Sequence, residues 1–141
     1  MAFKSTSPAD PSMLFAGLRH QSLEKVSNFK YRHALTQLRT SSHRLNIETG
    51  RHKDPKNKKL RLCNKCGIFD EDEIHFLLEC PLYNTERKML FDVYNINCAI
   101  NDVNRSAIFV LLMSSKYQCH LEALGRYVYT CFNIRKNQCY E

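Results

Sequence analysis

Four side chains of the kind that bind soft metal ions fall within 18 residues of this chain. They follow the pattern C-x2-C-x8-H-x4-C and are Cys63, Cys66, His75 and Cys80. Structural zinc sites place four cysteine or histidine ligands at the corners of a tetrahedron. Because four protein ligands leave no open coordination position, the pattern predicts one structural zinc ion and not a catalytic one.

The residues around these four support the same interpretation. Gly67 directly follows the second cysteine, where a tight turn often needs a positive φ. On a regular α-helix His75 and Cys80 would lie about 1.4 turns apart and would diverge. Pro81 ends such a helix, because the residue before a proline avoids helical angles, and this lets Cys80 turn back toward the ion.

A redox disulfide between Cys63 and Cys66 is the main alternative, but no βαβ pattern surrounds the pair. The total of seven cysteines is odd and does not suit a fully paired framework. The chain has neither a secretory apolar run nor a membrane span, so we expect an intracellular protein, nuclear or cytoplasmic, with reduced thiols. The other four cysteines are expected to be core residues or idle thiols: Cys98, Cys119, Cys131 and Cys139.

Positive charge is concentrated in the first half of the chain. The net charge is +7, and residues 19–62 hold twelve Lys or Arg against three Asp or Glu, a local balance of +9. Such a segment favours a polyanionic partner, most often a nucleic acid, because binding releases counterions. A solvated basic face would have the same composition, and composition alone does not separate the two.

The hydrophobic pattern predicts a mainly helical small domain built around the zinc site, with minimal strand. It divides the chain into a disordered N-terminus (1–13), a basic helical and loop segment (14–62), a zinc-binding finger with the helix after it (63–94), and apolar C-terminal helices (95–141). Helices are predicted at 29–43, 70–80, 86–94, 104–115 and 118–136. The predicted remainder is a short strand at 60–62 and a basic loop at 46–59, where Gly50 and Pro55 interrupt the periodicity.

Several motifs together resemble the C-terminal region of reverse transcriptases from non-LTR retrotransposons. In that family an AL-x-x-LR-type helix precedes a C-x2-C-x7–8-H-x4-C zinc-binding segment that ends in CP-x-Y. The corresponding stretches here are "YRHALTQLRTSSHRLNIETGRH", "RLCNKCGIFDEDEIHFLLECPLY" and "ERKMLF". The matching positions include Ala34, Leu35, Leu38, Arg39, Cys63, Cys66, His75, Cys80, Pro81 and Tyr83, and the resemblance spans roughly residues 28–136.

The resemblance implies a nucleic-acid-binding appendage of a reverse transcriptase that helps the enzyme engage RNA and DNA. These residues include no polymerase palm, endonuclease or other catalytic set, so we expect no enzymatic activity from them. The side chains predicted to contact phosphates, with little sequence readout, are Arg39, Arg44, Arg51, Lys58, Lys59 and Arg61. The alternatives are a protein-interaction module, docking its C-terminal helices on a reverse transcriptase or on its own copy, and a retroelement remnant without function.

Overall fold

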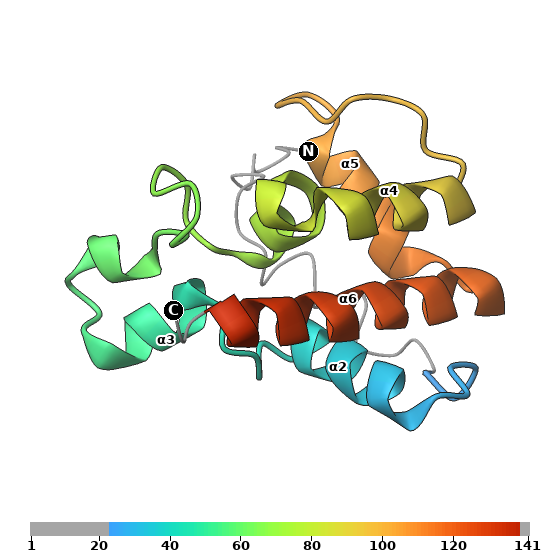
Figure 1. The fold of residues 1–141 in the computed structure, drawn as a ribbon, viewed down its shortest axis with the longest axis horizontal. Helices are drawn as coiled ribbons and strands as arrows, with labels where there is room; N and C mark the ends of the chain where they lie inside the picture. The colour runs from blue at the N-terminus through green and yellow to red at the C-terminus, as the bar shows by residue number, and fades with distance from the viewer. Residues whose placement is uncertain (1–22, 139–141) are drawn as a thin grey trace, which may run out of the picture.

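The computed structural model describes residues 23–138, and this part of the chain is mainly helical, as predicted (Figure 1). The predicted disordered segment 1–13 lies outside the described residues. The α-helices are α2 (Phe29–Arg39), α3 (Asn46–Lys53), α4 (Asn84–Val93), α5 (Arg105–Ser114) and α6 (Gln118–Gln138). Shorter turns are the 3-10 helices η1 (Lys58–Arg61) and η3 (Pro81–Tyr83) and the π-helix η2 (His75–Glu79).

Helix α6 forms the centre of the fold. Helices α2 and α4 both pack along it, and Figure 1 shows α2 on one side of α6 with α4 and α5 on the other. Apolar side chains from these helices and from the finger form one buried cluster, which runs in sequence from Val26 to Cys131. None of the described helices combines the length and the apolar character that a membrane crossing needs.

Helix α2 begins as predicted and ends earlier than predicted. The Asn28 side chain accepts hydrogen bonds from two N–H groups of the first turn, at 2.9 and 3.4 Å. The helix ends at Arg39 and not near residue 43, because Ser41 adopts a left-handed conformation with φ of 56°. The Ser42 N–H then donates to the Gln37 carbonyl at 2.9 Å, which closes the helix end.

Helix α3 corrects the prediction of a loop at 46–59. Its first N–H groups are satisfied by a residue distant in sequence: Asn46 N donates to the Glu71 carboxylate at 2.7 Å, and Ile47 N donates to the Glu71 carbonyl at 3.1 Å. Gly50 lies inside the helix. A side chain does not fit at this position, because a Cβ would come within 2.6 Å of the Leu60 carbonyl oxygen. The glycine therefore serves close packing of α3 on η1 and does not break the helix.

The later helices agree with the prediction to within a few residues. Helices α4, α5 and α6 correspond to the predicted ranges 86–94, 104–115 and 118–136. The predicted strand at 60–62 is reduced to one isolated antiparallel bridge between Leu62 and Asp70. Residues 23–138 contain no β-strand beyond this bridge. This bridge closes the base of the loop that carries the first two cysteines.

Candidate metal centre

The first two cysteines lie on a tight loop between Leu62 and Asp70. The Cys63 N–H donates to the Phe69 carbonyl at 2.8 Å, and the Gly67 N–H donates to the Cys63 carbonyl at 2.8 Å. Gly67 has a φ of 65°, which confirms the expectation of a positive φ after the second cysteine. The loop is therefore held by its own backbone in a shape that turns both thiols toward the following helix.

The other two candidate ligands lie on a short helix whose last turn is wider than an α-helical turn. It begins at Glu73 and not at Asp70, with the Asp72 carboxylate accepting from the His75 N–H at 2.8 Å. Over η2 the backbone follows π-helical geometry, and the Cys80 N–H donates to the His75 carbonyl at 2.8 Å. The wider turn brings these two residues nearly into line, which the sequence analysis attributed to Pro81 alone.

The ligand atoms of Cys63, His75 and Cys80 all lie within 4.8 Å of one another, and all three residues are buried. The Sγ atoms of Cys63 and Cys80 are 3.8 Å apart. The fourth predicted ligand, Cys66, is half-buried, and its Sγ lies 3.6 Å from Nε2 of His75. The three cysteines are free thiols and not a disulfide pair. The Cys63–His75–Cys80 group could hold a metal ion.

The pKa shifts of two candidate ligands, His75 and Cys66, favour the protonation states that bind metals. Burial lowers the pKa of His75, so its imidazole is neutral at neutral pH, the form that coordinates metals. Burial alone would raise the pKa of Cys66, but hydrogen bonds from the backbone N–H groups of Ile68 and Phe69 bring it below the usual value. Burial raises the pKa of Cys80 to about 11, so a metal must displace its proton.

Arg87 and Tyr127 hold the carbonyl end of the ligand-bearing helix, and the sequence analysis missed both. Arg87 is buried and donates to the carbonyls of Leu77 at 2.9 Å and Cys80 at 2.8 Å. The Tyr127 hydroxyl donates to the Phe76 carbonyl at 2.7 Å. These bonds satisfy carbonyl groups that lack partners at a helix end, and they fix the position of Cys80 from α4 and α6.

A second, partly buried network ties the loop of the first two cysteines to α3 and α6. The Arg135 guanidinium binds the Glu71 carboxylate at 2.7 and 2.9 Å and the Asn46 side-chain oxygen at 3.0 Å. The Asn46 amide donates to the Leu62 carbonyl, one residue before Cys63, at 2.7 Å. Within the acidic run at 70–73, Glu71 is thus a structural partner of α3 and α6.

His43 is a buried residue of the core. Its Nε2 lies 2.8 Å from Glu73 Oε1, and both side chains are almost fully buried. The Leu45 N–H donates to His43 Nδ1 at 3.3 Å, so Nε2 carries the proton and donates to the carboxylate. His43 and Glu73 are therefore committed to each other and are not metal ligands.

The side chains predicted to contact phosphates separate into three groups. Arg44, Arg51, Lys58 and Lys59 are exposed. Arg61 is half-buried and donates to the Pro55 carbonyl at 2.9 Å, so it stabilises the loop. Arg39 is a correction: it is buried and donates to the Met113 carbonyl at 3.1 Å, which removes it from the predicted contact surface.

The remaining cysteines lie apart from the candidate metal centre. Cys131 is buried in the core, and Cys98 and Cys119 are exposed, as expected for core and idle thiols. Cys139 lies outside the described residues. Comparisons with protein-family models, with curated proteins and with solved structures found no match to this chain. The resemblance to reverse transcriptases therefore stays a prediction, and the candidate site stands on its own geometry.

Proposed function

We propose that Cys63, Cys66, His75 and Cys80 hold one structural zinc ion. Zinc–ligand distances of about 2.3 Å to sulfur and about 2.0 Å to nitrogen imply tetrahedral edges of about 3.8 Å between sulfurs and about 3.5 Å between sulfur and nitrogen. The Cys63–Cys80 and Cys66–His75 separations of 3.8 and 3.6 Å agree with these edges. Soft thiolate and imidazole ligands favour zinc over magnesium or calcium.

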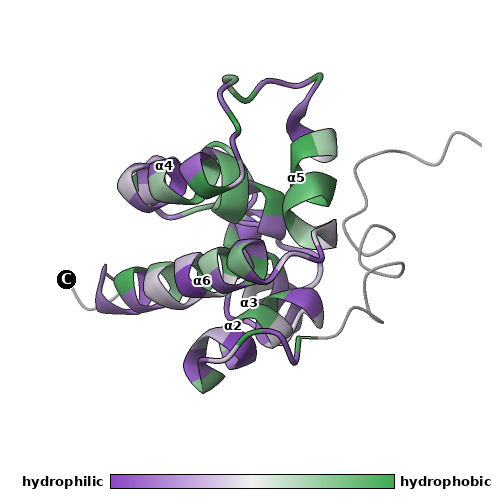
Figure 2. Cartoon of the chain, turned by 90° about the vertical axis from the view of Figure 1, so that its right-hand side faces the viewer, coloured by the Kyte–Doolittle hydropathy of each residue, from purple (hydrophilic) through white to green (hydrophobic). Residues whose placement is uncertain are grey.

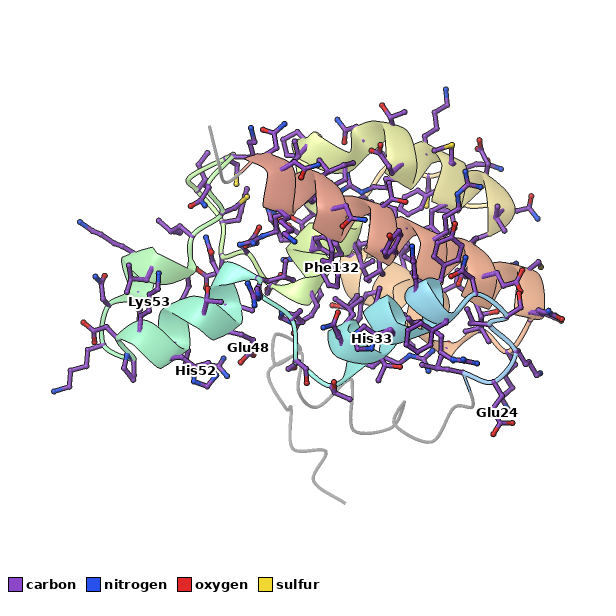
Figure 3. All side chains as sticks on the ribbon, turned by 60° about the horizontal axis from the view of Figure 1, so that its bottom comes forward. Glu24, His33, Glu48, His52, Lys53 and Phe132 are labelled. Atoms are coloured by element: carbon purple, nitrogen blue, oxygen red, sulfur yellow. The ribbon has the colours of Figure 1, made fainter. Side chains whose placement is uncertain are left out.

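We further propose that the zinc-stabilised domain binds nucleic acid through the basic lobe, which we define as residues 51–61. One observation carries this proposal: residues 51–60 are all exposed and hold five Lys or Arg against one Asp. The lobe extends from the helices around α6 at the end away from α5 (Figure 1), and Figure 3 labels His52 and Lys53 on it. A rigid, exposed run of cations suits phosphates better than a compact protein partner.

The lobe is ordered and not a loose basic tail. Gly50 brings α3 against the Leu60 backbone, and Arg61 closes the turn by binding the Pro55 carbonyl. The Asn46–Leu62 bond then joins the lobe to the first zinc ligand. Because the cations are presented on a fixed backbone, binding costs less ordering entropy than it would for a disordered segment.

The test is a titration of single-stranded RNA and DNA at several salt concentrations with the zinc-loaded protein. Each phosphate contact contributes about 0.7–0.9 to the slope of log K against log salt. We expect the double charge reversal K58E/K59E to lower the slope by roughly 1.5 and the low-salt affinity about tenfold. The control K88E/K116E, with equal charge change on α4 and the α5–α6 connection, should have little effect; equal effects of both variants would contradict the proposal.

A protein-interaction module is the second candidate, because apolar side chains of α5 are exposed. Val110 is 37% and Leu111 is 49% exposed, and Figure 2 shows α5 as largely hydrophobic. Under this alternative the C-terminal helices at 104–136 would dock on a reverse transcriptase or on a second copy of the chain. Docking through α5 would be insensitive to K58E/K59E and to salt, so the same titration separates the two functions. We expect no catalytic activity under either one.

A further inference from the structure

A groove of about 430 Å³ opens between the chain leaving α2 and the last turns of α6. Ser42 and Arg44 line it from one side, and Phe132, Asn133 and Lys136 line it from α6. None of the four proposed zinc ligands contributes to its wall. The groove is therefore separate from the candidate metal centre.

The wall of the groove is cationic. Arg44, Arg135 and Lys136 line it, and no carboxylate is among the described residues that do so. Arg135 is engaged with Glu71, whereas Arg44 and Lys136 are exposed on opposite walls. Two cations that flank one hollow can contact phosphates on both sides of a single bound nucleotide.

An aromatic ring supported from behind lines the same groove as these cations. Phe132 is half-buried, and its ring stacks on the buried ring of Phe76, with centroids 5.1 Å apart and planes 29° apart. Figure 3 shows Phe132 on the side of α6 next to the chain that leaves α2. A ring fixed in this way loses little entropy when a base stacks on it. Ser42 and Asn133 supply exposed polar atoms beside it.

The groove adjoins the basic lobe. Arg44 precedes α3 by two residues, and Arg135 donates to the Asn46 side chain at the start of that helix at 3.0 Å. A single nucleic-acid strand that leaves the groove past Arg44 therefore meets α3, the helix that leads into residues 51–61. The two surfaces can act on one continuous ligand.

We propose that this groove takes one unpaired base of a single-stranded nucleic acid, stacked on Phe132 with its neighbouring phosphates on Arg44 and Lys136. The inference rests on the proposed nucleic-acid binding and adds the ligand class to it. Bases inside a duplex are stacked and paired and cannot enter such a groove, whereas unpaired bases can be splayed out onto an aromatic ring. The lobe supplies affinity for any phosphate backbone, and the groove selects single strands.

The experiment measures fluorescence anisotropy of a labelled 12-nucleotide mixed-sequence RNA and of the same backbone with abasic sites. We expect the zinc-loaded protein to bind the RNA with bases about tenfold more tightly, within the range for loss of a stacked base. Phe132→Leu should abolish this preference, because it keeps apolar volume against Phe76 but removes the ring. Lys136→Glu should weaken binding of both oligonucleotides.

Phe91→Leu on α4 is the matched control, because Phe91 is also a half-buried aromatic residue packed against the core. It should retain the preference for bases, and thermal denaturation of both variants shows whether they are equally folded. Equal affinity of the unmodified protein for the two oligonucleotides, or an intact preference in folded Phe132→Leu, would overturn the inference. Salt-dependent binding by the lobe would survive that result, whereas loss of all binding at low salt would reject the proposed function itself.

Discussion

At the scale of single residues, the shape of the candidate metal centre depends on hydrogen bonds from side chains outside the set of candidate ligands. The Tyr127 hydroxyl is buried and donates to the Phe76 carbonyl at 2.7 Å, one residue after His75. Burial raises the pKa of Tyr127 well above its usual range, so the hydroxyl keeps its proton and remains a donor. Removing the hydroxyl takes away this hydrogen bond and leaves the Phe76 carbonyl, at the end of the ligand-bearing helix, without its shortest donor.

We therefore predict that Tyr127→Phe lowers the free energy of unfolding of the zinc-loaded protein by about 1–2 kcal/mol. Urea denaturation followed by circular dichroism measures this change. Tyr129→Phe is the control, because Tyr129 is half-buried on the same helix and removal of its hydroxyl should cost little. Equal losses in the two variants would show that the Phe76 carbonyl does not need the bond.

Gly67 offers a second test at the residue scale, because its φ of 65° is a conformation that side chains with a Cβ rarely adopt. A Cβ at this position meets no other atom within 4 Å, so Gly67→Ala introduces backbone strain without a clash. We predict a loss of about 1 kcal/mol in stability and a matching loss in zinc affinity. Gly67→Asn should cost less, since asparagine tolerates this region; a larger loss for asparagine would contradict the explanation.

At the scale of elements, Gly50 separates local helix propensity from packing. Propensity alone predicts that Gly50→Ala stabilises α3 by about 1 kcal/mol. A Cβ would lie 2.6 Å from the Leu60 carbonyl oxygen and 2.7 Å from its carbon, so the α3–η1 contact must open. We predict net destabilisation and faster amide exchange at residues 58–61. A stabilised variant with unchanged exchange would show that α3 and η1 do not depend on this contact.

The sequence predicts those elements whose signals are local, and α2 and α6 are examples. Asn28 caps α2 through its own side chain, and the buried positions Ala34, Leu35 and Leu38 follow the predicted helical spacing. Phe29, at the first position of the helix, is instead 68% exposed. Helix α3 was missed because Glu71, distant in sequence, satisfies its first N–H groups.

The candidate site shows the same division between local and distant information. The spacing of cysteines and histidine, and the glycine after Cys66, predict the tight loop without any tertiary information. The supporting residues Arg87 and Arg135 could not be predicted, since a buried arginine on an amphipathic helix has the same local pattern as an exposed one. Arg39 was misassigned for this reason, because only the neighbouring α5 provides the Met113 carbonyl that binds it.

At the scale of the whole molecule, the proposed zinc ion stabilises one end of a larger core. Most of the buried cluster comes from α2, α4, α5 and α6, outside the finger. Domains that fold only with zinc lack such a core. Loss of the ion should therefore release the finger and the parts tied to it through Glu71, Asn46 and Arg135, while the helical body remains folded.

We predict that a zinc chelator leaves most of the far-ultraviolet circular dichroism signal intact and speeds amide exchange at residues 46–83 and at the end of α6. The start of α6 should remain protected, because α2 packs along α6 and the Ser27 hydroxyl, just before α2, donates to the Glu122 carboxylate at 2.8 Å. Cys63→Ser should reproduce this pattern without chelator, whereas Cys98→Ser, which changes an exposed cysteine outside the site, should not. Uniform loss of protection would mean that the entire core depends on the metal. No change at 46–83 would contradict the prediction, because the bonds that anchor the basic lobe would then be independent of the proposed ion.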